Sequence, residues 1–141
     1  MHGKLSRRSR DDGAVAVEAA LAISILVVLI FGIVEFGMAL WSWNTMVLAV
    51  EDAGRYVMVH NASCDTSCAV SQMQTTLAAA PGSVSTTCTG APAANQICIS
   101  ATVPSPQTTP PTMTLTAVYG YNVIGLTGIQ TLTSQGTFPV D

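Results

Sequence analysis

The four cysteines are the side chains with the clearest covalent chemistry in this sequence. An even number of cysteines in a small domain favours two disulfides formed in an oxidising compartment. Three pairings are possible. Joining neighbours along the chain is favoured because the later two cysteines lie on adjacent strand candidates, although two cysteines inside one helix would bridge poorly. The candidates are Cys64 with Cys68, and Cys88 with Cys98.

A metal centre is the alternative use of these residues, since His60, Cys64, Asp65 and Cys68 cluster in the sequence. Their spacing lacks the two-residue cysteine pair that is typical of zinc sites, so we expect neither a metal nor another cofactor. The second histidine is His2, and no Ser-His-acid set or carboxylate pair can be assembled from the remaining residues. We therefore expect no enzymatic activity and no small-molecule substrate.

A different kind of chemistry is suggested by Glu18, which opens an apolar run that carries no further charge until after Val34. An ionised carboxylate inside hydrocarbon is costly, so Glu18 either lies at a membrane interface or has a function. Residues 14–43 are long enough, at about 1.5 Å per residue, to cross a hydrocarbon core of about 30 Å. We expect one transmembrane helix over these residues.

The charges are distributed as this topology requires. Residues 1–13 hold four basic and two acidic side chains, a net charge of +2, whereas the rest holds six acidic side chains and only Arg55, a net charge of −5. Basic residues before an apolar helix keep the N-terminus in the cytoplasm, and Trp41 and Trp43 would anchor the far side. A single basic residue after the leader argues against nucleic-acid binding.

Two other interpretations of the apolar run fit less well. A secretory signal peptide has a shorter apolar core, and the first acceptable cleavage site here, ending at Ala49, comes too late. A buried helix that is apolar on every face needs a larger surrounding protein than this chain supplies.

The leader, Gly13 and the early glutamate together resemble the class III signal of type IV prepilins. That resemblance implies cleavage by a prepilin peptidase between Gly13 and Ala14, which makes Glu18 the fifth residue of the mature chain. Cleavage would create an ammonium group at Ala14. An ammonium and a carboxylate offset each other's desolvation when they meet in an apolar medium, and the resemblance implies that the partner is a neighbouring subunit's ammonium.

The sequence is similar more narrowly to TadE-like proteins, the minor pseudopilins of the Tad (Flp) tight-adherence pilus. It has the "GIVEFG" patch and, in place of the usual small-small-Arg element "AAR", the triplet Ala53-Gly54-Arg55; "TLTAVYGYNVIGLTG" and "SQGTFPV" are similar to the closing pattern. The resemblance implies a structural protein of the bacterial cytoplasmic membrane, with its C-terminal domain outside. The implied partners are a prepilin peptidase, other pilins or pseudopilins, Tad assembly-platform membrane proteins and the lipid bilayer.

Helix-packing candidates follow inside the apolar run. Small residues repeat every four positions, which would let a second helix approach closely, although alanine-rich filler gives the same pattern. These residues are Ala16, Ala20 and Ser24. Glu35, between Gly32 and Gly37, could extend towards water or be buried against a partner helix.

Beyond the membrane we expect the helix to continue over residues 44–62, to about His60, followed by a disulfide-bonded domain over residues 63–141. A short helix is expected in "AVSQMQTTLAAA" and strands in "QICISATVP" and "TMTLTAVYGY", with Pro139 marking an edge strand. The predicted fold is α+β and pilin-like, with a small antiparallel sheet packed on the outer half of the long helix. The alternative function is an uncleaved single-pass anchor that displays a small binding module.

Overall fold

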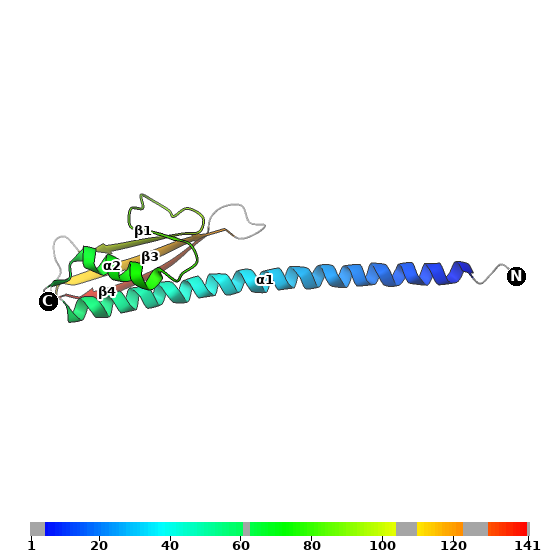
Figure 1. The fold of residues 1–141 in the computed structure, drawn as a ribbon, viewed down its shortest axis with the longest axis horizontal. Helices are drawn as coiled ribbons and strands as arrows, with labels where there is room; N and C mark the ends of the chain where they lie inside the picture. The colour runs from blue at the N-terminus through cyan, green and yellow to red at the C-terminus, as the bar shows by residue number, and fades with distance from the viewer. Residues whose placement is uncertain (1–4, 61–62, 104–109, 123–129, 141) are drawn as a thin grey trace. The chain divides into compact units, whose positions relative to one another are not determined.

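The computed structural model of the chain describes residues 5–60, 63–103, 110–122 and 130–140, with side chains from residue 13 onward. The chain divides into two compact units, Met1–Gly37 and Met38–Asp141, which we describe separately. The elements follow in the order α1, α2, β1, β2, β3 and β4, as labelled in Figure 1. This α+β layout confirms the predicted fold class.

Helix α1 comprises Leu5–Val59 and therefore begins well before the predicted start at Ala14. The leader contains no proline, and Gly13 weakens a helix by about 1 kcal/mol relative to alanine without breaking it. The helix ends where the His60 amide donates to the Tyr56 carbonyl at 3.0 Å, and the two rings stack at 4.1 Å.

Helix α2 comprises Thr66–Leu77 and begins three residues before the segment in which we expected it. Its buried residues, Ala69, Met73 and Leu77, recur every four positions and so lie on one face. That face packs into the core of the second unit.

The sheet contains four strands in the order β1-β2-β3-β4. Their bounds are Ser83–Ser85, Gln96–Thr102, Thr112–Tyr121 and Gln130–Pro139. β2 and β3 confirm the two strands expected from alternating apolar residues. Strand β3 pairs antiparallel with both of its neighbours, β2 and β4.

The predicted antiparallel sheet is wrong in one respect, because β1 pairs parallel with β2 and the sheet is mixed. The alternation rule could not detect β1, which is three residues long and has only Val84 as an apolar member. The segment between β1 and β2 returns the chain to the end of the sheet at which β1 begins. At this end Gly82 has φ +119°, and the Ser83 amide donates to the Asn95 carbonyl at 3.0 Å.

The core of the second unit lies between the outer part of α1, α2 and one face of the sheet. The sheet contributes Ile97, Ile99, Met113, Leu115, Ala117 and Tyr119, and α1 contributes Met46, Ala49, Val50, Ala53 and Val57. The α1 positions are separated by no more than four residues and form one stripe of the helix. Figure 1 shows this end of α1 running along the strands.

Helix α1 approaches the sheet closely at Gly54. A Cβ atom there would overlap the ring of Phe138 on β4. Gly136 on β4 lies next to the same ring. A Cβ atom on Gly136 would lie 2.7 Å from the Phe138 ring and 3.0 Å from the Val50 side chain. Phe138 thus fills a space that exists because two glycines lack side chains.

Replacing Gly54 with Ala should destabilise the second unit. The inserted methyl group costs about 1–3 kcal/mol where no space exists, which exceeds the gain of up to about 1 kcal/mol from better helix propensity. In a Phe138→Leu background the same change should instead stabilise, because only the propensity gain remains. Chemical denaturation of the detergent-solubilised chain, followed by near-ultraviolet circular dichroism, measures both.

Gly37 provides the matched control, because it lies in α1 with nothing within 4 Å of its Cβ position. Gly37→Ala should not depend on the residue at position 138. Equal effects of Gly54→Ala in the two backgrounds would contradict the proposed contact.

Candidate processing site, membrane helix and disulfide-closed turn

The part of α1 from Gly13 onward is long and apolar enough to cross a membrane. Its most apolar window of 18 residues has a mean hydropathy of 2.8, and none of that window is buried by the rest of the chain. Val28, for example, is 73% exposed and Ile25 69%. Apolar surface left in water costs roughly 25 cal/mol per Å², so a helix of this kind needs lipid or other helices around it. The alternative of a buried core helix does not apply to this chain.

The predicted processing residues Gly13, Ala14 and Glu18 all lie on α1 and are exposed. Apart from its chain neighbours and the local helix backbone, no atom of the described residues lies within 4 Å of the position where Gly13 would carry a Cβ. The packing described within this chain therefore gives no reason for glycine at position 13, although glycine weakens the helix there. A requirement of another molecule, such as a processing enzyme, would give one.

Glu18 lies about one helical turn after Ala14 on α1. Among the side chains that the structure describes, none forms a hydrogen bond or an ion pair with the Glu18 carboxylate. Its predicted ammonium partner does not yet exist in the uncleaved chain. The role of Glu18 therefore stays a prediction.

The predicted helix-packing residues Ala16, Ala20 and Ser24 are exposed on α1. The Ser24 hydroxyl donates to the Ala20 carbonyl at 2.8 Å, so this polar group is satisfied within the helix. The resulting side of the helix is small and uncharged, as close approach in lipid requires. Glu35 is only partly exposed, and Gly32 and Gly37 on either side of it have open space at their Cβ positions.

The cysteines form two disulfides, Cys64 with Cys68 and Cys88 with Cys98. Pairing at a separation of four residues is possible because Cys64 precedes the N-cap of α2 and only Cys68 lies in the helix. Their Cα atoms are 5.2 Å apart. The second bridge ties the segment after β1 to β2, across a separation of ten residues.

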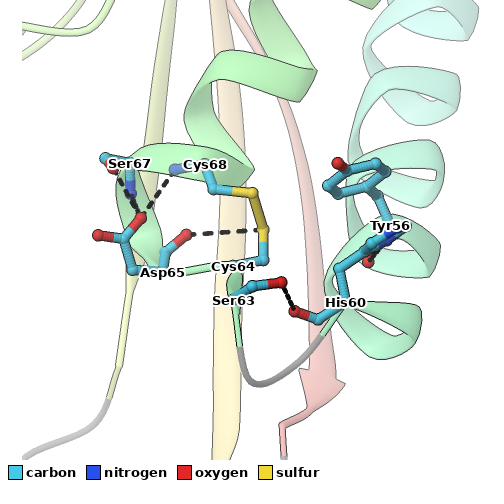
Figure 2. Close-up of a disulfide and its surroundings, with 7 residues drawn as sticks. All are labelled: Tyr56, His60, Ser63, Cys64, Asp65, Ser67 and Cys68. Atoms are coloured by element: carbon cyan, nitrogen blue, oxygen red, sulfur yellow. Dashed lines mark hydrogen bonds between the residues drawn. A yellow bond between two sulfur atoms is a disulfide. The ribbon is translucent and has the colours of Figure 1, made fainter.

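The first disulfide joins the residue before the N-cap of α2 to the first turn of this helix, which is stabilised further by Asp65 (Figure 2). One carboxylate oxygen of Asp65 accepts from the Ser67 and Cys68 amides, each at 3.0 Å, and from the Ser67 hydroxyl at 2.6 Å. The Ser67 hydroxyl, with the Cys68 amide next, lowers the pKa of Asp65 below its ordinary value. Asp65 is thus the N-cap of α2.

These bonds account for every residue that we considered as a metal ligand in this turn. Zinc binds cysteine as thiolate, whereas both sulfur atoms here are bonded to each other. The Asp65 carboxylate caps α2, and His60 stacks on Tyr56 (Figure 2). In the described part of the chain, no three His, Cys, Asp or Glu residues are grouped as metal ligands would be.

A contact that sequence reasoning missed connects the two helices of the second unit. The Asp52 carboxylate accepts from the Gln72 amide nitrogen at 3.2 Å and from the Thr76 hydroxyl at 3.1 Å. The donors lie at least twenty positions away in the sequence, so local sequence patterns could not predict these hydrogen bonds. These two hydrogen bonds join α2 to the outer part of α1.

The fold and these sites define an α+β protein with one candidate membrane helix and a small disulfide-bonded domain. Residues 13–55 match the family model described as TadE-like protein. The resemblance inferred from the sequence is confirmed over these residues, which are similar to the corresponding segment of TadE-like proteins. Comparison with curated proteins finds no match. Comparison with solved structures also finds none.

The charge on Asp65 should stabilise the second unit at neutral pH and lose this effect in acid. Because folding lowers its pKa, the contribution is present above the ordinary value of about 3.8 and disappears as the pH falls through the folded value. The substitution Asp65→Asn keeps a capping oxygen but removes the charge. The stability difference between wild type and Asp65→Asn should therefore shrink as the pH falls below about 3.8.

Denaturant unfolding curves of both proteins between pH 7 and pH 2 measure this difference. Asp141→Asn, which removes a carboxylate at the end of the chain, serves as the control for net charge. A difference between wild type and Asp65→Asn that does not vary with pH would contradict the assignment of the cap.

Proposed function

We propose that this protein is a structural minor pseudopilin of the TadE type. A prepilin peptidase cleaves it between Gly13 and Ala14, and the mature chain takes part in assembling a Tad (Flp, type IVb) pilus for surface adherence. The observation that carries this proposal is the family match, which begins at Gly13 and ends at Arg55. The basic leader thus lies outside the matched segment, as expected of a part that is removed.

Recognition by the peptidase has a physical basis at Gly13. The bond to Ala14 lies within α1, and a helical bond must open locally before a peptidase can bind it in an extended form. Glycine lowers the free energy of that opening by about 1 kcal/mol relative to alanine. The exposure of Gly13 and the space around its Cβ position support access to the bond.

After cleavage, the new ammonium group of Ala14 and the carboxylate of Glu18 provide opposite charges at the start of the apolar helix. Pairing them between subunits offsets the desolvation that each would suffer alone in lipid. The role proposed here is therefore structural: the chain is the substrate of an enzyme and is not itself one. Its partners are the peptidase, other pilins or pseudopilins, and the membrane proteins of the Tad assembly platform.

The proposed location is the bacterial cytoplasmic membrane, crossed once. The four basic residues of the leader support a cytoplasmic N-terminus. Two disulfides in the second unit support an oxidising, extracytoplasmic location for it. Both features give the same orientation.

Mass spectrometry of the protein extracted from membranes of peptidase-positive cells should find Ala14 at the N-terminus, and peptidase-deficient cells should retain the leader. Gly13→Ala should slow the cleavage because it stiffens the helix and adds a methyl group at the bond. Gly32→Ala, at a similarly open helical position, is the matched control. An intact leader in cells with active peptidase would refute the proposal.

Glu18→Gln separates the proposed role from that of an uncleaved anchor. A pilus component that lacks this carboxylate should be inserted in the membrane but fail to assemble, whereas an anchor should lose little. Glu51→Gln is the control, since Glu51 is exposed and its pair with Arg55, at 3.9 Å, is worth under about 0.5 kcal/mol. Counting pili by electron microscopy, with immunoblots of membrane fractions, gives the answer. Normal piliation of the Glu18→Gln strain would favour the anchor.

A further inference from the structure

Strand β4 forms one edge of the sheet, and half of its backbone groups point away from the sheet. All ten residues of β4 pair one-to-one with β3, and the Val140 amide donates to the Pro111 carbonyl at 2.9 Å. Antiparallel pairs alternate between hydrogen-bonded and non-hydrogen-bonded positions, so the even-numbered residues of β4 bond to β3. The odd-numbered residues therefore direct their amides outward: Thr131, Thr133, Gln135 and Thr137.

These four outward amides have no hydrogen-bond partner among the residues that the structure describes. We call the row the free edge of β4. A run of unpaired amides and carbonyls is a template for another strand, and proteins usually protect such an edge.

Within the described residues of β4, the edge carries few of the usual protections. The strand has no charged side chain and no bulge, and its one proline, Pro139, is the last residue. It is ten residues long, whereas β1 at the opposite edge has only three. The β1 edge is thus too short to pair with a long strand. The β4 edge offers outward amides from Thr131 to Thr137.

The side chains along the free edge indicate what kind of strand fits. On the outer face Thr133, Gln135 and Thr137 are exposed and uncharged. The Thr137 and Thr114 hydroxyls are 3.2 Å apart, so threonines already pair across strands on this face. On the opposite face Leu132 and Phe138 are only partly buried against the core. Apolar side chains of an added strand would cover them.

We propose that the free edge of β4 binds an extended, uncharged segment of a partner protein, which adds a fifth, antiparallel strand to the sheet. The segment alternates apolar side chains, on the α1 side, with Thr, Ser or Gln on the outer side. Main-chain hydrogen bonds provide affinity in this mode of recognition, and alternate side chains provide specificity. Charged segments are disfavoured because β4 offers them no opposite charge.

The partner is a different protein and not a second copy of this chain. Val50 lies against Gly136 and Gly54 against Phe138, so α1 and β4 run in the same direction. Antiparallel pairing of two β4 strands would set the outer parts of two α1 helices in opposite directions. The Met38 ends of the two copies, each of which continues into the proposed membrane segment, would then lie at opposite ends of the paired strands, which disfavours this pairing for two copies in one membrane. This exclusion of a second copy rests on the proposed membrane anchoring, whereas the open edge does not.

The test uses the full-length, ¹⁵N-labelled protein in lipid nanodiscs and a synthetic peptide with the sequence of residues 130–140. The free peptide has no anchor and can pair antiparallel with β4. Nuclear magnetic resonance should show amide exchange slowed by about tenfold or more at Thr131, Thr133, Gln135 and Thr137. Even-numbered amides, which already bond to β3, should change little.

A peptide with alternate amides N-methylated is the matched control and should protect nothing. Uniform protection along β4, or protection at Thr114 and Thr116 on the sheet face, would overturn the proposal. Protection of the odd-numbered amides that rises with protein concentration, without peptide, would show that a second copy occupies the edge and would overturn the assignment to a different protein. None of these measurements needs the peptidase or the pilus, so they are independent of the proposed function.

Two variants at Gln135 test whether the outward amides of β4 bind the peptide. Gln135→Pro removes an outward amide without removing a bond to β3, a change that edge strands tolerate. Gln135→Ala keeps the amide. The proline variant should lose peptide-induced protection at Thr133 and Thr137, and the alanine variant should retain it. Unchanged chemical shifts of core residues Ile99 and Leu115 show that the variant is folded. Equal protection in both folded variants would overturn the proposal, and the N-methylated peptide decides it should Gln135→Pro not fold.

Discussion

Helix α1 has to satisfy two different surroundings with one continuous set of backbone hydrogen bonds. Over residues 19–34 its side chains are uncharged, mostly apolar and exposed, whereas in the second unit a single stripe, from Met46 to Val57, packs in a core. A helix is suited to both, because its backbone groups are bonded within the element and only the side chains need to match the surroundings. The rest of the second unit depends on the position of that stripe.

The last strand packs closely against α1 where α1 lacks a side chain. Gly54 and Gly136 admit the ring of Phe138, and this ring joins the last strand to the helix. The triplet Ala53-Gly54-Arg55, in which glycine replaces the second alanine of the usual "AAR" element, therefore has a packing reason in this chain. Asp52 then holds α2 beside α1, and Asp65 with the Cys64–Cys68 bridge stabilises the start of α2.

The start of α2 and the free edge of β4 differ in how far their polar groups are bonded within the chain. Around α2, the Asp65 carboxylate has its hydrogen-bond donors, and the cysteines are covalently joined. At β4, by contrast, a long neutral edge keeps its outward amides without a partner in the part of the chain that is described. A small domain with a covalently closed helix start and one open edge suits the role in assembly that we propose.

The sequence alone determined the features that depend on residues close together in the chain. Hydropathy and charge predicted the apolar helix and the basic leader, alternation predicted β2 and β3, and Gly13 with Glu18 carried the resemblance that the family match supports over residues 13–55. Only the tertiary structure decided the parallel pairing of β1, the contact of Gly54 with Phe138 and the hydrogen bonds to Asp52. Each of these joins segments that are separated in the sequence. Its free energy depends on distances that arise only when the chain has folded, so no local spacing of residue types could reveal it.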